Sequence, residues 1–525
     1  MNPFPVNEEM TNKQKRLFVW HNLSEFEKNS RMFILSGIFI FLFLASISFY
    51  GPRGSDQFWY MQEIENLVKN NAITSNFYYS GMYWREAFNE HNNYFIHHSL
   101  VHYLVYPLAY IFGSFAGWFF TSIISIIIGT LLLVNTTYNI TRSHKIASLA
   151  GLFFLFLPCT VWQSFNILQE SIMCSYMCLC VWLWERSLNV SKEKKIFYDI
   201  LGGLAGAIGV LIHPLFTVWC IGWIIKLLFE RGFVFSCRLW VPVISTFLSL
   251  LTIQYLKKNI FPTKFMPSIA TIISNTSMTY FFDYVLNDVT LNVILCKFIN
   301  AIKNQFAFSG TAIFFYPFNI LLGFFLFSVF YTYKKNKLAD LRPFIIPMFI
   351  LIGFLGVIIL HQNQFRYNLI ITPLILVSTI FGLYKTNLHS AICKKPFLYS
   401  LIMILAFLVF IDFNLARHIY KDSYRYAITT DNHKKILPDN SRNQKVLFIF
   451  KGDDYLSYGW ALYPRKILFL PLAKMSAPES YEVVQKFKPQ IVLVQGMLDE
   501  DIEKVLPLKV AKLSSNPDEL YKVVD

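Results

Sequence analysis

The chain has 525 residues, of which 55% are hydrophobic, 18% aromatic and only 15% charged. These values, with a mean hydropathy of +0.43, lie well outside the composition of soluble globular proteins. The formal net charge of +15 does not require a nucleic-acid partner, because many of the Lys and Arg residues lie in short loops between apolar segments, where they set membrane topology. The sequence therefore predicts a polytopic, α-helical membrane protein.

The first apolar run, at residues 32–50, is long enough to cross a bilayer. Residues 1–31 are polar and basic, so we expect them to be a cytoplasmic segment and the run to be an uncleaved anchor. Ten further candidate spans follow, at residues 115–138, 146–162, 169–184, 197–213, 215–229, 239–256, 311–332, 344–361, 368–384 and 397–413.

Residues 97–112 are apolar but short, and they carry Pro107 in their middle. If this segment crossed the membrane, basic loop residues such as Arg142 and Arg186 would lie opposite the basic N-terminus. If it lies in the membrane interface, these residues share the cytoplasm with the N-terminus, as the positive-inside rule favours. The interfacial interpretation predicts about eleven spans, a cytoplasmic N-terminus, and a first outer loop at residues 51–113.

Asp56 stands near the start of this loop and heads an amphipathic stretch that ends near residue 70. A helix there would be interfacial, with Glu63 and Glu65 facing water. Its apolar stripe consists of Tyr60, Ile64, Leu67 and Val68. Membrane anchoring alone would explain such a helix, but it would not explain an acidic residue at its head.

After the N-terminal segment, we expect a transmembrane domain at residues 32–413 and a small extracytoplasmic α/β domain at residues 414–525. Strands are predicted at residues 445–450, 466–470, 490–496 and 520–524, and helices at 477–487 and 499–506. No GxGxxG follows a strand, so nothing indicates nucleotide binding there.

Ionisable residues near the ends of spans are candidates for function. Glu170 begins the fourth predicted span, and Asp412 ends the last. For Glu170, a structural explanation is also open, because a carboxylate at a helix N-terminus is stabilised by the helix dipole.

The order of these features resembles the GT-C class of polyprenyl-phosphate-sugar-dependent glycosyltransferases. A first span is followed by an acidic residue and an amphipathic helix, then by an interfacial segment ending in FG. An acidic residue follows the third span, and the signature "QFRYNLIITPL" lies at residues 364–374. The resemblance covers roughly residues 30–385. The nearest relatives would be aminoarabinose transferases, protein O-mannosyltransferases and RgtA/B/C/D-like bacterial enzymes.

The resemblance implies roles for five residues. Asp56 matches the acidic residue of the first loop, expected to be the catalytic base, and Glu170 matches the acidic residue after the third span. Arg366 and Tyr367 match the late signature and would bind the donor phosphate. His213 stands in "LIHPLF", where many relatives carry Lys-Gly-Pro; this is a departure, because neutral histidine binds anions less well than lysine.

The resemblance also suggests a site for a divalent metal ion, since some relatives bind such an ion in the first outer loop. The residues that would hold it are Glu90, His91, His97 and His98. Adjacent histidines point to different faces of a helix, so His97 and His98 cannot easily share one ion. The alternative is that all four are polar loop residues, and no other cofactor is expected.

The expected function is transfer of a sugar from a polyprenyl-phosphate donor to a hydroxyl of a glycan, glycolipid or protein acceptor. The alternatives are a transporter or flippase of lipid-linked sugars, a polysaccharide polymerase or ligase, and a non-catalytic assembly subunit. Usage rich in Lys, Asn, Ile and Phe suggests a bacterium. The expected location is therefore the bacterial plasma membrane, with the site on its outer face.

Overall fold

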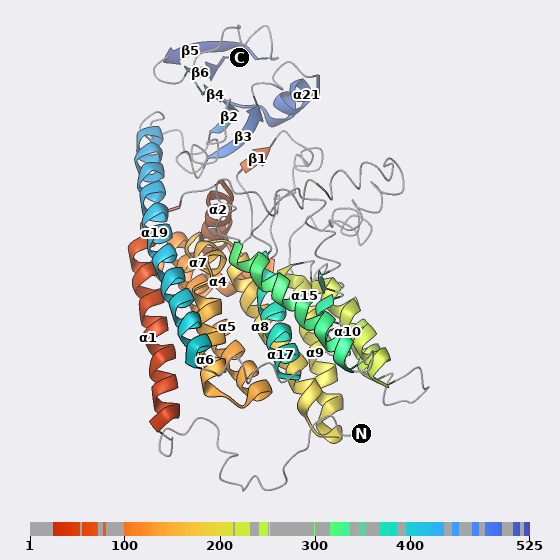
Figure 1. Ribbon diagram of the computed structural model, residues 1–525. Helices are drawn as coiled ribbons and strands as arrows, with labels where there is room; N and C mark the ends of the chain where they lie inside the picture. Colours follow the sequence, from red (N-terminus) through yellow and green to blue (C-terminus); the bar gives the residue numbers. More distant parts are fainter. Residues whose placement is uncertain are drawn as a thin grey trace.

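A computed structural model describes the chain at residues 25–52, 55–71, 77–79, 99–213, 216–231, 241–249, 251–252, 316–336, 368–385, 395–434, 444–450, 465–471, 478–495, 508–514 and 519–524, and at a few isolated positions. The described helices are α1 (Glu25–Ser48), α2 (Ser55–Asn70), α4 (Ser99–Phe112), α5 (Ser114–Thr141), α6 (His144–Leu155), α7 (Pro158–Phe165), α8 (Glu170–Asn189), α9 (Lys192–Ile212), α10 (Phe216–Arg231), α15 (Tyr316–Asn336), α17 (Asn368–Lys385), α19 (Lys395–Lys434) and α21 (Pro478–Phe487). Figure 1 shows a helical bundle with a β-sheet at one end, called here the sheet end.

Four described helices, α1, α5, α9 and α19, are each long and apolar enough to cross a membrane. They coincide with predicted spans, as do α8, α10, α15 and α17. The structure thus confirms a mostly helical membrane protein. The predicted span at 239–256 is described as a helix over residues 241–249, and most of the span at 344–361 lies outside the described residues.

The predicted span at 146–162 is not one straight helix. It consists of α6 and α7, which meet at an angle of 51°. Pro158 is the first residue of α7; it has no N–H to donate to the preceding turn, so the helix is interrupted and restarts there. The prediction of an unbroken span was therefore wrong at this proline.

Helix α4 corresponds to the ambiguous segment at 97–112 and contains Pro107. Its 14 residues rise about 21 Å, less than the ~30 Å hydrocarbon core of a bilayer, which agrees with the interfacial interpretation. Gly113, at φ 88°, makes the tight turn into α5. A Cβ at Gly117 would lie 2.4 Å from the backbone of Ala109, so glycine permits the close approach of α4 and α5.

Glycines also bring α9 and α10 together. A Cβ at Gly202 would lie 2.1 Å from the ring of Trp223, and one at Gly206 would lie 2.6 Å from the ring of Trp219. Small residues that let helices approach closely are the usual basis of packing in membranes, where burial of apolar surface provides little drive. The two tryptophan rings fill the space that the missing side chains leave.

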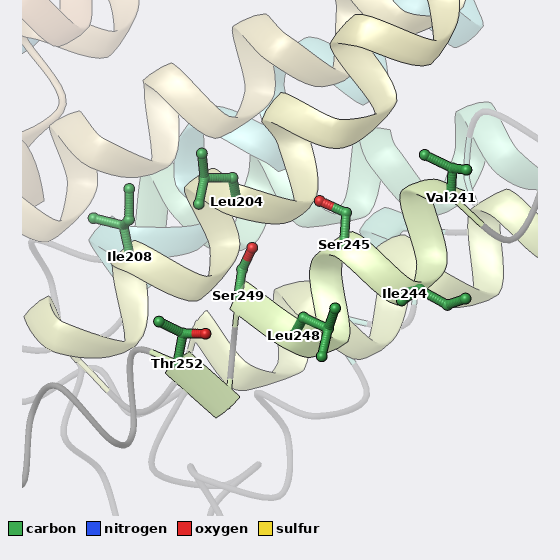
Figure 2. A pocket seen from close by; sticks show the side chains of 8 residues that line it. All are labelled: Leu204, Ile208, Val241, Ile244, Ser245, Leu248, Ser249 and Thr252. Atoms are coloured by element: carbon green, nitrogen blue, oxygen red, sulfur yellow. The ribbon is translucent and has the colours of Figure 1, made fainter.

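A groove of about 640 Å³ lies between α9 and the helix at 241–249. Figure 2 shows its lining, which comprises Leu204, Ile208, Val241, Ile244, Ser245, Leu248, Ser249 and Thr252. The lining carries three hydroxyl groups and no charged group, so it suits a hydrocarbon chain better than a phosphate. Val241 and Leu248 are about half exposed, as expected of residues that face lipid.

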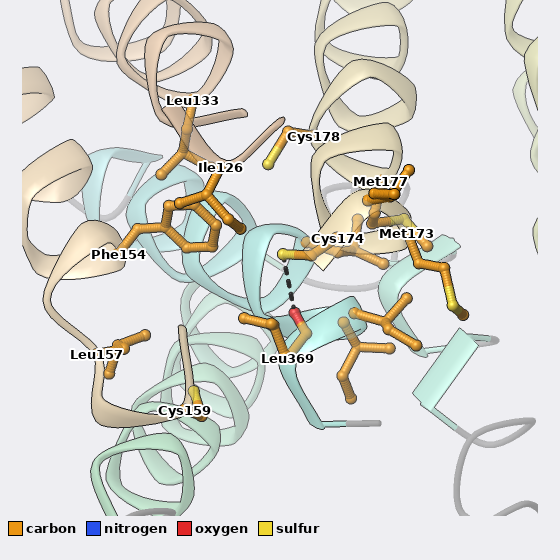
Figure 3. Close-up of a cluster of buried hydrophobic side chains, with 14 of the residues drawn as sticks. Ile126, Leu133, Phe154, Leu157, Cys159, Met173, Cys174, Met177, Cys178 and Leu369 are labelled. Carbon is orange, nitrogen blue, oxygen red and sulfur yellow. Dashed lines mark hydrogen bonds between the residues drawn. The ribbon is translucent and has the colours of Figure 1, made fainter. Parts of the chain in front are cut away.

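The centre of the bundle is formed by α5, α8 and α17. Figure 3 shows buried apolar side chains that meet there, among them Ile126, Leu133 and Phe154. Gly129 of α5 allows α8 to approach, since a Cβ there would lie 3.1 Å from Ser175 and 3.3 Å from the Cys178 sulfur. The described cysteines are all buried and unpaired by disulfides, and they act as small packing residues.

The sheet has six strands: β1 (Phe77–Tyr79), β2 (Lys445–Phe450), β3 (Lys466–Pro471), β4 (Ile491–Val494), β5 (Val510–Ser514) and β6 (Glu519–Val523). Their order is β1-β3-β2-β4-β6-β5. The strands β1, β3, β2 and β4 are parallel, whereas β6 pairs antiparallel with β4 and β5. Strands β2, β3, β4 and β6 and helix α21 match the predictions; β1 and β5 were not predicted, and the helix expected at 499–506 lies outside the described residues.

The two faces of the sheet pack against different partners. On β2, Leu447 and Ile449 face α21 and contact its Val483 and Phe487. The alternate residues of β2, including Phe448, form a second cluster on the opposite face. This alternation follows from the two-residue period of a β-strand, and it leaves the second face for the helical bundle.

Helix α19 runs uninterrupted from Lys395 to Lys434, although the last span was expected to end at residue 413. Its 40 residues rise about 60 Å, twice the thickness of a hydrocarbon core. In Figure 1 its upper part rises beyond the end of α1 toward the sheet. The division of the chain at residue 414 stays a prediction.

Candidate active site

Helix α2 lies between the bundle and the sheet (Figure 1), and most of its described side chains are buried. The predicted apolar stripe is buried, as Tyr60, Ile64 and Leu67 show. Glu63 is also fully buried, so the expectation that it faces water was wrong. Glu65 is partly exposed and forms an ion pair with Lys69 at 2.8 Å.

Glu63 is buried because it has a partner on α4. Its Oε2 lies 2.8 Å from Nε2 of His102, and both side chains are fully buried. The ring of Trp118 on α5 stands edge-on to His102, with 5.7 Å between centroids. The same indole donates its Nε1–H to the carbonyl of Tyr60 at 3.2 Å. These contacts fix α2 against α4 and α5.

Asp56 lies in the first turn of α2, and its side chain lies outside the described part of the structure. The next residue, Gln57, is buried and donates from Nε2 to Oδ1 of Asn166 at 3.2 Å. Asn166 follows α7 directly, and its own Nδ2 donates to the carbonyl of Trp162 at 2.6 Å. The amide of Asn166 is thereby oriented to accept from Gln57, and the start of α2 is held at the end of α7.

The turn from α7 to α8 runs from Asn166 to Glu170, which is the first residue of α8. Within it, Ile167 has a φ of 44° and is fully buried. A β-branched residue is strained in this region, and such strain persists where the surroundings impose it, often at functional sites. Glu170 is fully buried, and its position at the helix N-terminus suits a negative charge.

The described part of the late signature, residues 368–374, also lies near the start of α8. Arg366 and Tyr367 lie outside the described residues, and α17 begins directly after them, at Asn368. The Cys174 thiol, one turn along α8 from Glu170, donates to the carbonyl of Leu369 at 3.2 Å (Figure 3). The starts of α8 and α17 therefore lie side by side.

His213 ends α9 in an extended conformation and is half-buried. Its carbonyl accepts from the N–H of Phe216, which opens α10. The ring of Phe216 meets Tyr176 of α8 edge-on, with 5.2 Å between centroids. Tyr176 lies six residues, or about 9 Å along the helix, beyond Glu170. The turn that carries His213 is thus near the first turns of α8.

The sheet is also attached to this region. Phe58, two residues after Asp56, packs into the cluster formed by the second sheet face, and its ring lies 6.3 Å from that of Tyr426 on α19. Strand β1, from the segment expected to be the first outer loop, pairs with β3 over Phe77–Tyr79. The loop that follows Asp56 is therefore part of the sheet structure, which the sequence did not indicate.

The four residues considered for a metal site, Glu90, His91, His97 and His98, lie outside the described residues. Within the described parts of the chain, no three His, Cys, Asp or Glu side chains are grouped so that they could hold an ion.

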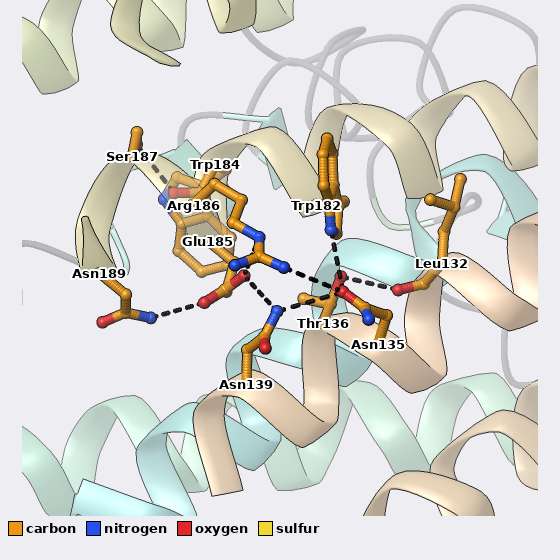
Figure 4. Close-up of polar contacts among 10 residues, drawn as sticks. All are labelled: Leu132, Asn135, Thr136, Asn139, Trp182, Trp184, Glu185, Arg186, Ser187 and Asn189. Carbon is orange, nitrogen blue, oxygen red and sulfur yellow. Dashed lines mark hydrogen bonds and ion pairs between the residues drawn. The ribbon is translucent and has the colours of Figure 1, made fainter. Parts of the chain in front are cut away.

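A second polar cluster lies at the other ends of α5 and α8 (Figure 4). Asn139 donates to Glu185 at 3.1 Å, and Asn135 accepts from Trp182 and from Arg186. Glu185 is 15 residues from Glu170 along α8, or about 22 Å. This cluster joins α5 to α8 and is separate from the site at the sheet end.

Sequence patterns did not reveal Gln57, His102 and Asn166. Gln57 and Asn166 are ordinary polar residues next to better candidates, and their contact depends on two segments far apart in the chain. His102 could have been noticed, because an ionisable side chain in an apolar helix usually has a partner.

No protein-family model and no curated protein sequence matches the chain. Among solved structures, it is similar to ArnT from Cupriavidus metallidurans bound to undecaprenyl phosphate, with 11% identity, a TM-score of 0.59, and coverage of 94% of this chain and 98% of ArnT. The apo state of that protein gives 10% identity, a TM-score of 0.54, and coverage of 95% and 98%. The arabinofuranosyltransferase AftD from mycobacteria gives 12% identity and a TM-score of 0.47, with 96% of this chain but 40% of AftD covered.

The match to ArnT covers nearly the whole of both chains, so it includes the helical bundle and the sheet. At this identity the similarity concerns the fold. The chain therefore has the fold of ArnT, and its resemblance to the GT-C class of polyprenyl-phosphate-sugar-dependent glycosyltransferases is confirmed at the level of the fold.

Proposed function

We propose that this chain is an integral membrane glycosyltransferase. It transfers a sugar from a polyprenyl-phosphate donor to a hydroxyl of a glycolipid, polysaccharide or protein acceptor. The donor class is supported by the fold, since the similar ArnT was solved with undecaprenyl phosphate bound.

The observation that carries the proposal is the hydrogen bond between Gln57 and Asn166. It brings the first turn of α2, with Asp56, to the turn that opens α8 at Glu170. Two acidic residues 114 positions apart in the numbering thus belong to one end of the bundle. A positioned carboxylate is one of the groups that can act as general base toward a hydroxyl.

In the proposed reaction, Asp56 accepts the proton of the acceptor hydroxyl as its oxygen attacks C1 of the donor sugar. The bond between C1 and the phosphate oxygen breaks, and its electron pair stays on the polyprenyl phosphate. A correctly placed carboxylate base contributes on the order of 10²–10⁴-fold to such a step. Glu170 lies at the adjacent helix start, where it would orient the acceptor or share in proton transfer.

The leaving phosphate gains negative charge and needs cations or donors nearby. Arg366 would supply a bidentate pair of N–H donors, and Tyr367 a hydroxyl. Both precede α17, whose start lies beside α8. His213, in the α9–α10 turn, would contribute a weaker contact than the lysine of many relatives. A divalent ion held by Glu90, His91, His97 and His98 stays a proposal, and no step depends on it.

The proposed location is the bacterial plasma membrane, with the N-terminus cytoplasmic and the sheet outside. The charge distribution of the sequence supports this orientation. Lipid-linked sugar would then reach the site from within the outer leaflet, while the acceptor approaches from beneath the sheet.

The proposal is tested by measuring transfer from a panel of labelled polyprenyl-phosphate sugars by the purified full chain. Wild type is compared with Asp56→Asn and with the control Glu65→Gln, which removes a carboxylate from the same helix at its partly exposed Lys69 pair. We expect Asp56→Asn to lose at least about 100-fold in kcat and Glu65→Gln to match wild type. Thermal unfolding and undecaprenyl-phosphate binding of each protein check that folding and donor binding are retained.

Three results are informative. Equal transfer by wild type and Asp56→Asn would remove Asp56 from the mechanism, and Glu170→Gln would then be compared in the same assay. Equal loss of transfer in Asp56→Asn and in the control Glu65→Gln would contradict a specific role for Asp56. If wild type transfers none of the sugars to any acceptor class yet moves lipid-linked sugar across liposome membranes, the chain is a transporter.

A further inference from the structure

Two adjacent residues attach the first turn of α2 to different parts of the structure. Gln57 is bonded to Asn166 of the bundle. Phe58 packs on the sheet face opposite α21, in a cluster that includes Phe448 and Phe469 and is called here the bundle-side cluster. Among the described apolar side chains of α2, Phe58 alone belongs to this cluster, whereas the other buried ones belong to the core of the bundle. The first turn of α2 is therefore held from two sides.

The ring of Phe58 is closely enclosed. The residue is 1% exposed, and its ring lies edge-on to that of Tyr426 on α19, with 6.3 Å between the centroids and 61° between the planes. Phe58 thus packs where α2, α19 and the sheet come together. Side chains in a protein interior are packed as densely as in a crystal, so a displacement of this ring requires its neighbours to move as well.

The sheet also holds the chain beyond α2. The helix ends at Asn70, and β1 begins at Phe77. Strand β1 pairs in parallel with β3, with Phe77 opposite Ile467 and Tyr79 opposite Phe469. Ile467 and Phe469 are themselves members of the bundle-side cluster. The segment from α2 to β1 is thus attached to the sheet both near the start of the helix and after its end.

These contacts matter for the site because Asp56 lies so close to them. Phe58 follows Asp56 by two residues, or about 3 Å along the helix axis. The first turn of a helix frays readily, because its N–H groups have no partners within the helix, so contacts such as those of Gln57 and Phe58 decide how well it is fixed. A general base must lie within hydrogen-bond reach of the proton that it accepts, and a misplacement of about 1 Å can cost up to about 100-fold in rate.

We propose that Phe58 is a positioning residue, through which the sheet holds the first turn of α2, and with it Asp56, in place. The sheet then contributes to sugar transfer without supplying a group that reacts. The alternative role for Phe58 is to dock the sheet on the bundle, which would affect stability but not the chemical step. The catalytic part of this inference rests on the proposed function, whereas the attachment of α2 to the sheet does not and is measured separately.

The test compares the full-length wild type with Phe58→Ala and Phe58→Leu. Phe487→Ala is the matched control, because it truncates a similarly buried phenylalanine of α21 on the other face of the sheet. Hydrogen exchange of the backbone N–H groups of residues 59–64 measures local opening at the start of α2. We expect about tenfold faster exchange in Phe58→Ala, since truncation of a buried phenylalanine is among the most costly core substitutions, and no change in Phe487→Ala.

The second measurement is kcat and KM for sugar transfer. For Phe58→Ala we expect kcat to fall about 10–100-fold, with little change in the KM for the polyprenyl-phosphate sugar, because the proposed phosphate contacts lie on other segments. Phe58→Leu fills most of the same space and should recover most of the lost kcat, and Phe487→Ala should keep the kcat of wild type. If Phe58→Ala does not fold, Tyr426→Ala, which removes the ring on the other side of the contact, takes its place with the same expectations.

Three results would overturn the proposal. The first is unchanged exchange of residues 59–64 in Phe58→Ala. The second is an equal loss of kcat in Phe58→Ala and Phe487→Ala, because general loosening of the sheet would then explain both. The third is faster exchange with unchanged kcat, which would leave Phe58 only the docking role. If wild type transfers no sugar, the proposed function fails, whereas faster exchange confined to Phe58→Ala would still support the attachment of α2 to the sheet.

Discussion

Gln57 of α2 and Asn166 of the α7–α8 turn are joined by a buried hydrogen bond of 3.2 Å, although 109 positions separate them in the chain. The bond lies one residue from Asp56 and four residues from Glu170. Because Asn166 is itself oriented by its bond to the Trp162 carbonyl, the pair defines where the start of α2 sits. The two acidic residues of the proposed site are therefore positioned by neutral neighbours.

Replacing Gln57 by leucine removes the donor while keeping the volume similar. We expect about tenfold lower kcat for sugar transfer, because without this bond the start of α2, and with it the proposed base Asp56, is less well positioned, and a misplacement of about 1 Å can cost up to about 100-fold in rate. The measurement is kcat and KM of Gln57→Leu beside Glu65→Gln as control. A change in thermal stability with unchanged kcat would show that the bond has only a structural role.

The buried pair of Glu63 and His102 gives a stability prediction that does not depend on the assigned function. Glu63→Leu leaves the His102 ring buried without its carboxylate, at a cost of about 1–3 kcal/mol. His102→Leu leaves the carboxylate and should cost at least as much. In a double-mutant cycle followed by thermal unfolding, the double variant should be less destabilised than the sum. Additive effects would contradict a direct interaction.

The glycine contact between α9 and α10 predicts an effect of a single methyl group. In Gly202→Ala the new Cβ would lie 2.1 Å from the Trp223 ring, and that ring is held by its bond to the Asp199 carbonyl at 2.8 Å. We expect destabilisation by about 1–3 kcal/mol. Gly323→Ala on α15 is the control, because its Cβ would meet nothing within 4 Å and alanine favours a helix. Equal unfolding temperatures for the two variants would disprove the close contact.

A buried ion pair ties α8, α9 and α10 together at the end opposite the sheet. Lys226 Nζ lies 3.1 Å from Asp199 Oδ1 and donates to Ser187 Oγ at 2.7 Å. Lys226→Met should cost about 3–5 kcal/mol, because it leaves the Asp199 charge buried. Adding Asp199→Leu should restore most of that stability. If the second substitution destabilises further, Asp199 has another essential partner.

Local patterns predicted those parts of the fold that depend on local chemistry. The spans α1 and α5 follow from long apolar runs, and β2 and β4 from short apolar runs rich in β-branched residues. Strand β1 has only three residues and β5 includes the polar residues Lys512 and Ser514; both pair with edges that β3 and β6 offer. The break at Pro158 could have been predicted, since proline interrupts a helix wherever it stands within a span.

The site was predicted less completely because its contacts join distant segments. Asp56 and Glu170 were chosen by resemblance, while the contact that brings their segments together belongs to Gln57 and Asn166. Glu63 was predicted to face water because the 3.6-residue pattern suggested a helix with only one buried face. The helix has neighbours on several sides, and a histidine on α4 makes burial of that carboxylate favourable.

Asp412 was expected at the outer end of the last span, but it lies within α19, fully buried, where the helix contacts α7. Among the described residues, none forms a hydrogen bond with either oxygen of its carboxyl group. Burial of a polar group without such a bond costs free energy, so Asp412 is not explained by its contribution to stability.

We expect Asp412→Leu to raise the free energy of unfolding by about 1 kcal/mol or more, because it removes a buried polar group and keeps an apolar contact with α7. Asp412→Asn, which keeps the polar group, is the matched control and should stay close to wild type. Thermal unfolding of the three proteins in one detergent provides the measurement. If Asp412→Leu is more stable than wild type but no longer transfers sugar, the carboxyl group has a functional role. Functional sites often retain residues that lower the stability of the fold. Destabilisation by leucine would show that the carboxyl group has a stabilising partner.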